Sequence, residues 1–148
     1  MRALVQRVSS ASVLLADGTR RAIGPGLLIL LGVGKGDTEE AARRLSEKVL
    51  NLRIFSNAAG KFDRSLLDEK GQALVISQFT LFGDPWQGRR PDFTSAAAPS
   101  EAQPLYLRFA ALLEEAGVAV RTGEFGAHMA VESVNDGPVT LWVDTQKG

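Results

Sequence analysis

The most informative run in the sequence is LLILLGVG, residues 27–34, which follows Gly24-Pro25-Gly26. An unbroken apolar run bounded by glycines is typical of a strand that is covered on both faces, because it shows no alternation between an inner and an outer face. We therefore expect residues 27–34 to form a central strand of a sheet, with the other elements arranged around it.

The chain before this run has β character. Residues 2–8 and 11–16 are two short runs of strand type, and residues 19–23 follow the turn dipeptide Asp17-Gly18. A tight turn between two such runs is typical of a β-hairpin. The protein is therefore predicted to open in β structure.

Two later segments show the helical period. The first starts near Asp37, with Glu40 at the spacing of a capping box, and the second starts at Ser100, with Gln103 at the same spacing. Gly117 is predicted to end the second helix. Apolar residues share one face of each segment, namely Ala41, Ala42, Leu45, Val49 and Leu52 in the first and Leu105, Phe109, Leu112, Leu113 and Ala116 in the second.

Further strands are predicted after the first helix. Residues 73–82 form the most strand-like segment of the chain, and shorter runs of strand type are residues 53–55, 118–121, 128–134 and 139–143. The last two are predicted to be joined by a turn. This order of elements favours one mixed α/β domain over residues 1–148, with a curved β-sheet or open barrel flanked by two helices.

Composition excludes several classes of protein. The chain has 148 residues and no cysteine, so disulfide scaffolds and thiolate metal sites are excluded. The 17 basic and 17 acidic side chains cancel, so any contact with RNA must be local, and the one concentrated basic segment is residues 88–91. No apolar run approaches the roughly 20 residues that cross a bilayer. With no signal sequence visible, we expect a cytoplasmic protein without a membrane partner.

Polar side chains interrupt the most strand-like segment. Ser77, Gln78 and Thr80 lie among apolar neighbours, and an unsatisfied buried polar group costs about 1 to 3 kcal/mol. Two interpretations are open. Either Ser77 and Thr80 bond to neighbouring backbone while Gln78 faces solvent, or the three form the polar floor of a pocket at a sheet edge.

A second unusual stretch is NDGPVT, residues 135–140. Asn-Asp-Gly alone is an ordinary turn sequence, but the proline that follows removes a backbone donor and fixes φ. Glycine, which has no Cβ, lets another molecule approach its backbone closely. The stretch is therefore either a plain turn or a place of close approach.

Most standard catalytic patterns are missing. The chain has no Gly-x-Ser-x-Gly elbow and no dinucleotide fingerprint, and the glycine-rich residues 32–36 lack the spacing of a phosphate loop. His128 is the only histidine, which excludes a histidine-rich metal site, and we predict no metal and no cofactor. An esterase that uses Ser77 or Thr80 with His128 is a minor alternative, and it requires a contact within about 3.2 Å between nucleophile and base.

Read together, the two stretches resemble the D-aminoacyl-tRNA deacylase family, also called D-tyrosyl-tRNA deacylases. The resemblance rests on SQFTL at residues 77–81 and NDGPVT at residues 135–140, together with an MRALVQRV opening. It extends along the chain through LLILLGVGKGDTEE, KVLNLRIF and GRRPDF in the family's order. Several blocks in order are far more specific than a single short motif.

The resemblance implies a homodimeric cytoplasmic enzyme that hydrolyses the ester between a D-amino acid and the 3′-terminal ribose of tRNA, and that also accepts glycine mischarged on tRNA. It implies a catalytic pocket of Ser77, Gln78, Phe79 and Thr80 in one subunit. Gly137 and Pro138 of the other subunit would cap that pocket through a cis peptide bond. Arg7 matches the arginine that helps to hold this Gly-Pro segment.

The resemblance also explains the missing catalytic side chains. An aminoacyl ester is already activated, so backbone donors and an oriented water can carry out its hydrolysis without acid–base side chains. If Gly137 and Pro138 press against the substrate α-carbon, an L side chain collides and a D side chain or glycine does not.

Residues 84–87, DPWQ, replace the family's usual polar, basic stretch and lose a positive charge. A non-catalytic module that binds the tRNA acceptor end is the alternative function.

Overall fold

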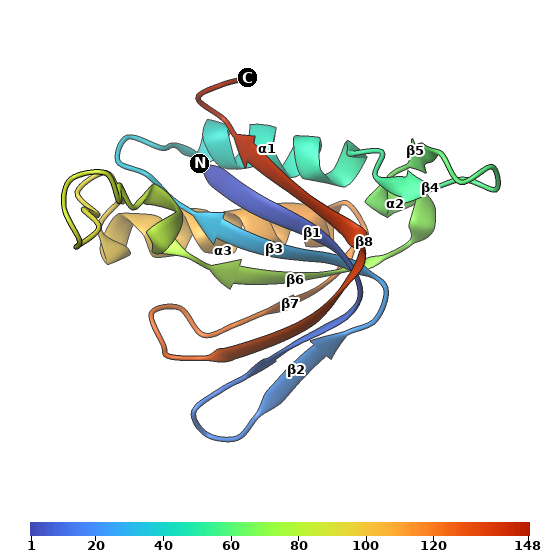
Figure 1. Cartoon of the computed structure of the whole chain (residues 1–148), viewed down its shortest axis with the longest axis horizontal. Helices are drawn as coiled ribbons and strands as arrows, with labels where there is room; N and C mark the ends of the chain where they lie inside the picture. The colour runs from blue at the N-terminus through green and yellow to red at the C-terminus, as the bar shows by residue number, and fades with distance from the viewer.

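The computed structural model, which describes residues 1–148, contains a strongly curved sheet with its long helices on one face (Figure 1). The sheet has six strands in the order β2 (Arg20–Ile23), β1 (Arg2–Leu14), β3 (Gly26–Gly32), β6 (Gln72–Ser77) and β7 (Ala119–Thr122), with β8 (Ala130–Asp144) also paired to β1. A small ribbon of β4 (Phe55–Ser56) and β5 (Phe62–Arg64) lies apart from it. The predicted mixed α/β class with a curved, barrel-like sheet is confirmed.

The helices are α1 (Glu39–Asn51), α3 (Pro99–Glu115), the short α2 (Leu66–Glu69) and the 3₁₀ helix η1 (Phe79–Phe82). The two predicted helices correspond to α1 and α3, which pack together against the sheet. The sequence patterns did not reveal α2, η1 or β5. No helix combines the length and the apolar character that crossing a membrane requires.

The run at residues 27–34 forms the centre of the sheet, as predicted. β3 pairs antiparallel with β1 on one side and parallel with β6 on the other. Leu27, Ile29 and Leu31 join the larger apolar core beneath α1 and α3, whereas Leu28 faces a second core enclosed by the curled sheet. Both faces of β3 are therefore covered, which is why its apolar residues do not alternate with polar ones.

Two of the predicted strand pairs are single long strands. Residues 2–8 and most of residues 11–16 lie in β1, which ends at Leu14. Residues 128–134 and 139–143 fall largely within β8, so the predicted turn at residues 135–138 is wrong. The two strands stay paired because their register shifts twice, between Gln6 and Val8 and between Val8 and Ser10. Such a bulge accommodates extra residues without ending the pairing.

Both predicted capping boxes are wrong. The carboxylate of Asp37 accepts hydrogen bonds from the backbone N–H of Gly34 and from the Met1 amino group, both at 2.7 Å, and Thr38 is the N-cap of α1. α3 begins at Pro99, because a proline is well suited to the first turn of a helix, so the predicted start at Ser100 is already inside it. Gly117 follows the end of α3 with a φ of +94°, as predicted.

The strand predicted over residues 73–82 is only half correct. β6 ends at Ser77, and residues 79–82 form η1. The strand predicted at residues 53–55 is also displaced, since β4 covers Phe55–Ser56. The end of β6 creates the site described next.

Candidate active site

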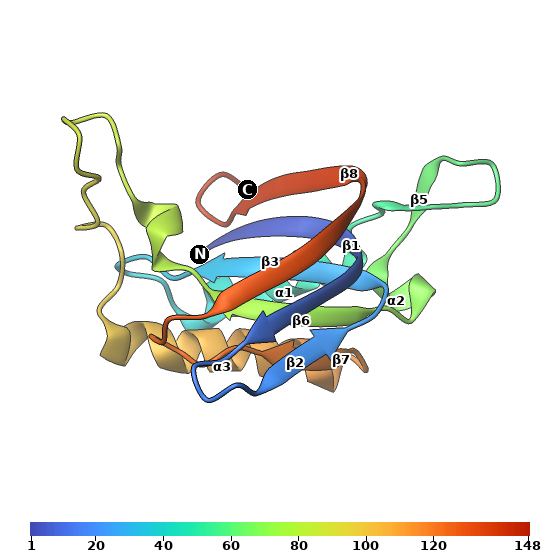
Figure 2. The ribbon, with the colours of Figure 1, turned by 60° about the horizontal axis from the view of Figure 1, so that its bottom comes forward.

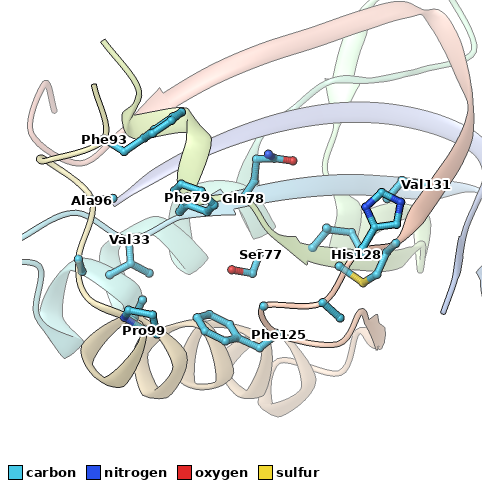
Figure 3. Close-up of a pocket in the computed structure, with 16 residues that line it drawn as sticks. Val33, Ser77, Gln78, Phe79, Phe93, Ala96, Pro99, Phe125, His128 and Val131 are labelled. Carbon is cyan, nitrogen blue, oxygen red and sulfur yellow. The ribbon is translucent and has the colours of Figure 1, made fainter. Parts of the chain in front are cut away.

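A mainly apolar cavity opens at one edge of the sheet. β3, β6 and β7 are parallel, so their carboxyl ends meet at this edge, where ligands of open α/β sheets usually bind. The cavity measures about 570 Å³, and 11 of its 16 lining residues are hydrophobic (Figure 3). Its walls come from the end of β3, the end of β6 with η1, the start of α3 and the loop between β7 and β8.

The chain turns sharply where it leaves β6. The backbone N–H of Gln78 donates to the carbonyl oxygen of Leu31 at 2.8 Å, and η1 then carries Phe82 back over β3. Gly34 makes room for this turn, because a Cβ at that position would lie 2.4 Å from the Phe82 ring. Arg2 fixes the far side, since its Nη1 donates to the Leu81 carbonyl at 3.0 Å. Gly32 and Gly34 thus allow η1 to pack closely against the end of β3.

Three of the four predicted catalytic residues line this cavity. Ser77 and Gln78 contribute its polar surface, and Phe79 packs edge-on against Phe93 with ring centroids 5.2 Å apart. Thr80 is exposed beside the cavity, and its hydroxyl oxygen accepts a hydrogen bond from the Gln78 side-chain amide. The arrangement favours the pocket-floor interpretation for Ser77 and Gln78.

The backbone of this segment offers hydrogen-bond donors as well. Phe79 and Thr80 are the first residues of η1, and the first amides of a helix have no carbonyl partner within it. No side chain or loop carbonyl accepts a hydrogen bond from either amide. Two N–H groups without an acceptor in their own helix therefore lie next to the polar floor.

His128 lies across the cavity from Ser77 (Figure 3). No hydrogen bond joins His128 to Ser77 or Thr80, so the contact that a serine or threonine esterase requires is absent from the structure. The arrangement thus gives that alternative no support. No cluster of three or more histidine, cysteine, aspartate or glutamate residues is placed to hold a metal ion.

The Gly137-Pro138 segment lies elsewhere, as an exposed excursion within β8. Its peptide bond is cis, as the resemblance implies. Arg7 fixes the segment with hydrogen bonds: its Nε donates to the Asp136 carbonyl at 2.9 Å, and its Nη1 donates to the Ile54 carbonyl at 2.7 Å. Arg7 therefore joins the excursion to the chain just before β4.

Asn135 closes the excursion. Its Oδ1 accepts from the Val139 N–H at 2.8 Å and its Nδ2 donates to the Thr140 hydroxyl at 2.9 Å. Gly137 has a φ of +136°, and a Cβ there would lie 2.8 Å from the Val139 side chain. The packing and backbone conformation of its own chain thus require a glycine at this position.

Within one chain the two motifs are separated. Arg7 pairs with Leu27 at the amino end of β3, whereas Ser77 pairs with Leu31 at its carboxyl end. Four residues of strand span roughly 13 Å, and neither Gly137 nor Pro138 lines the cavity. The structure therefore brings together Ser77, Gln78 and Phe79 on one side and Arg7, Gly137 and Pro138 on the other, but not the two groups.

Several cavity residues were not found from the sequence. They come from loops or from the start of α3, and among them are Phe93, Ala96, Pro99, Phe125 and Met129. Loop residues carry no periodic pattern, so no sequence signal marks them as neighbours of Ser77. The bend after Phe82 and the loop after β7 bring them together.

The fold and the cavity together define the class of protein: a mixed α/β protein with an apolar, polar-floored binding site at the carboxyl ends of its parallel strands. The sequence profile of one family, described as D-Tyr-tRNA(Tyr) deacylase, matches residues 4–144. The chain belongs to this family. The resemblance noted in the sequence is thereby confirmed, and the chain is an enzyme of the deacylase class.

Individual relatives cover nearly the whole chain. It is 59% identical to a D-aminoacyl-tRNA deacylase of Roseiflexus sp. (strain RS-1), over 98% of this chain and 94% of the relative. It is 53% identical to the protein of the same name from Thermotoga petrophila, over 99% of each. A solved c-Myc DNA unwinding element binding protein superposes with a TM-score of 0.90 at 38% identity, over 97% of this chain and 98% of that one.

Proposed function

We propose that this protein hydrolyses the ester bond of D-aminoacyl-tRNA and releases the free D-amino acid and tRNA. The observation that carries the proposal is the cavity at the end of β6, where Ser77 and Gln78 lie among apolar residues and the amides of Phe79 and Thr80, at the start of η1, have no partner within that helix. The names of the relatives from Roseiflexus and Thermotoga give the substrate class. Residues 1–148 act as one deacylase domain, in the cytoplasm where aminoacyl-tRNA is used.

The cavity suits the 3′-terminal nucleoside of tRNA. Its aromatic and aliphatic walls can stack on a planar base, as proteins that bind unpaired RNA commonly do. The side chains of Ser77 and Gln78 then supply hydrogen bonds to the polar edges of the nucleoside. With the nucleoside held there, the ester lies beside the amides of Phe79 and Thr80.

The chemistry follows from those amides. A water molecule adds to the ester carbonyl carbon, and the oxygen that gains negative charge is stabilised by backbone N–H groups. The bond to the ribose oxygen then breaks, and the proton lost by the water ends on that oxygen. Since the ester is activated and positioned, no side-chain base is needed, and the catalytic residues Ser77, Gln78, Phe79 and Thr80 act mainly by position.

Selection for D-amino acids comes from Gly137 and Pro138 of a second copy. Their backbone forms a wall against the substrate α-carbon, so an L side chain collides while a D side chain points to solvent. Glycine has no side chain to exclude, so mischarged glycyl-tRNA is also hydrolysed. Arg7 contributes by holding the wall in place.

Two observations support a homodimer with sites made by both copies. The wall and the cavity are too far apart to meet within one chain, as the register of β3 indicates. In addition, β8 exposes large apolar side chains, namely Val131, Val134, Leu141 and Trp142. Exposed apolar surface of this kind is typical of a face that is covered by a partner, and a second copy with two-fold symmetry provides two equal sites.

A deacylation panel tests the activity. We expect purified protein to hydrolyse D-aminoacyl-tRNA and glycyl-tRNA well above the buffer rate while L-aminoacyl-tRNA stays intact. The alternative, a module that only binds the acceptor end, predicts tight tRNA binding with D-aminoacyl-tRNA as long-lived as in buffer. Rapid hydrolysis of the L ester would overturn the proposed wall.

A mixed dimer tests the shared site. One copy carries Gly34→Ala, which displaces the cavity wall, and the other carries Gly137→Ala, with different affinity tags so that only mixed dimers are purified. If each site uses both copies, one of the two sites is intact and about half of the normal activity returns. If each chain holds its own complete site, the mixed dimer stays as inactive as its parents.

A further inference from the structure

The loop between η1 and α3 carries a second group of residues that the deacylase site does not use. Asp84 and Asp92 exchange backbone hydrogen bonds, both at 2.8 Å, and close a loop over residues 84–92. This loop projects beyond the edge of the sheet (Figure 2). Trp86 on the loop is 90% exposed, the highest value among the exposed large hydrophobic residues.

The base of the loop is joined to the cavity. Phe93 directly follows the closing residue Asp92 and forms part of the cavity wall against Phe79. At the other strand of the loop, Gly83 allows close packing, because a Cβ there would lie 2.7 Å from the Phe93 ring. The loop therefore projects from the wall of the cavity itself.

The charges of the loop are arranged so that its tip is basic. The acidic side chains lie at the base, where Asp84 accepts from the Trp86 N–H at 3.0 Å and Asp92 accepts from the Thr94 N–H at 3.3 Å. Arg89 and Arg90 are exposed, and neither has a salt-bridge partner or a side-chain hydrogen bond. The tip thus presents one free aromatic face and two free guanidinium groups.

This combination fits one kind of partner. Unpaired nucleic acid is bound by aromatic side chains that stack on bases together with basic side chains that contact phosphates, and stacking alone contributes about 1 to 3 kcal/mol per base. Because Trp86 is 90% exposed, its apolar ring stays in contact with water and buries almost no surface in the fold of the free protein. A base of the partner supplies the contact that Trp86 lacks.

We propose that Trp86 stacks on an unpaired base near the 3′ end of the bound tRNA, while Arg89 and Arg90 contact the adjacent phosphates. The inference rests on the proposed function, because the cavity holds the terminal nucleoside and the loop projects from its wall. The tRNA end is then held partly by a contact that salt does not weaken.

Kinetics with D-aminoacyl-tRNA test the stacking. We expect Trp86→Ala to raise KM roughly 5- to 50-fold with kcat unchanged, and Trp86→Phe to restore most of the affinity. Leu107→Ala, at an exposed position of α3 that is 51% accessible, is the matched control and should leave both constants unchanged. An unaltered KM in Trp86→Ala, with normal hydrolysis by the unmodified protein, overturns the stacking and leaves the deacylase function standing.

Binding of uncharged RNA gives a readout that does not depend on hydrolysis. A hairpin that reproduces the acceptor stem with its unpaired 3′ end should quench tryptophan fluorescence in the unmodified protein and much less in Trp86→Ala. The same hairpin with a blunt end should quench weakly. Arg89→Ala and Arg90→Ala should each lower the salt dependence of binding by about one phosphate contact. Equal quenching by blunt and overhanging hairpins refutes the proposal even if the protein hydrolyses no ester.

Discussion

The two unusual motifs of this chain lie at the levels of the two opposite ends of β3, one at the end of β6 and the other in β8, and different interactions hold them. At the carboxyl end, η1 is seated by close packing, with Phe82 5% exposed against Gly34. At the amino end, Gly137 and Pro138 are exposed and held by a few hydrogen bonds from Arg7 and Asn135. The first end forms a cavity, whereas Gly137 and Pro138 at the other end project from the surface and do not line that cavity. The proposed site uses both ends, and for this reason we propose that it combines two copies.

Gly34→Ala attacks the packed end and should have the largest effect. The new Cβ would lie 2.4 Å from the Phe82 ring, so η1 must move. A displacement of about 1 Å in a catalytic segment can cost roughly 100-fold in rate. We expect kcat/KM to fall by at least that amount, measured with D-aminoacyl-tRNA. Gly24→Ala, whose nearest contact would be 3.5 Å away, is the control and should stay close to normal.

Gly137→Ala attacks the projecting end. The substitution places a Cβ against Val139 at a φ of +136°, so we expect a loss of unfolding free energy of about 1 to 3 kcal/mol. Activity on D-aminoacyl-tRNA should fall about 10- to 100-fold, and the variant should not gain activity on the L ester. A variant that kept full activity while losing stability would show that this end does not contact the substrate.

Thr80→Ala separates side chain from backbone at the packed end. The hydroxyl accepts a hydrogen bond from Gln78, whereas the Thr80 amide is retained in alanine. We expect kcat to stay within about 10-fold of normal, because in the proposed mechanism the backbone amide stabilises the oxyanion. A loss of several orders of magnitude, with a covalent acyl-enzyme trapped on quenching, would mean that the hydroxyl is a nucleophile.

Substitution of Tyr106, a buried residue of α3 in the larger apolar core, should have the smallest effect on activity of the changes considered. Its hydroxyl donates to the Val75 carbonyl at 2.9 Å, and burial raises the pKa of Tyr106 to about 12. The folded protein therefore stabilises the neutral, protonated form of the Tyr106 phenol. This contribution is complete below pH 10, the ordinary pKa, and is lost as the pH rises from about 10 to about 12.

The measurement is denaturant unfolding across that pH range. The unmodified protein should lose stability between pH 10 and pH 12, and Tyr106→Phe should lose less because phenylalanine does not ionise. At pH 7 the variant should be destabilised by about 1 kcal/mol, since the Val75 carbonyl loses its donor. Identical pH profiles for the two proteins would rule out this linkage.

Sequence patterns predicted the elements that have a simple periodicity. The apolar run at residues 27–34 became the central strand, and the two helical segments became α1 and α3. Patterns failed where a partner decides the structure. Asp37 has the spacing of a capping box, but its carboxylate is already engaged by Gly34 and the Met1 amine, so Thr38 begins the helix without a side-chain cap.

The site residues also fall into two groups, those that the local sequence indicated and those that only the folded chain brings together. Ser77 and Gln78 were marked by their polarity in an apolar segment, and both line the cavity. The resemblance to a known family, and not the local pattern, pointed to Gly137 and Pro138, since NDG by itself indicates only a turn. Phe93 and Phe125 carried no signal, because loop residues become neighbours only when the chain has folded.

The α/β class, the central strand and the family resemblance could all be predicted before the structure was known, because apolar runs, helical periods and ordered motifs are properties of residues near one another in the chain. The end of β6 at Ser77 and the continuation of one strand through residues 135–138 became visible only in the folded protein. Both outcomes depend on contacts between distant segments: Phe82 against Gly34, and Arg7 beneath Asp136. The separation of the two motifs along β3 follows from strand register, which no local pattern specifies.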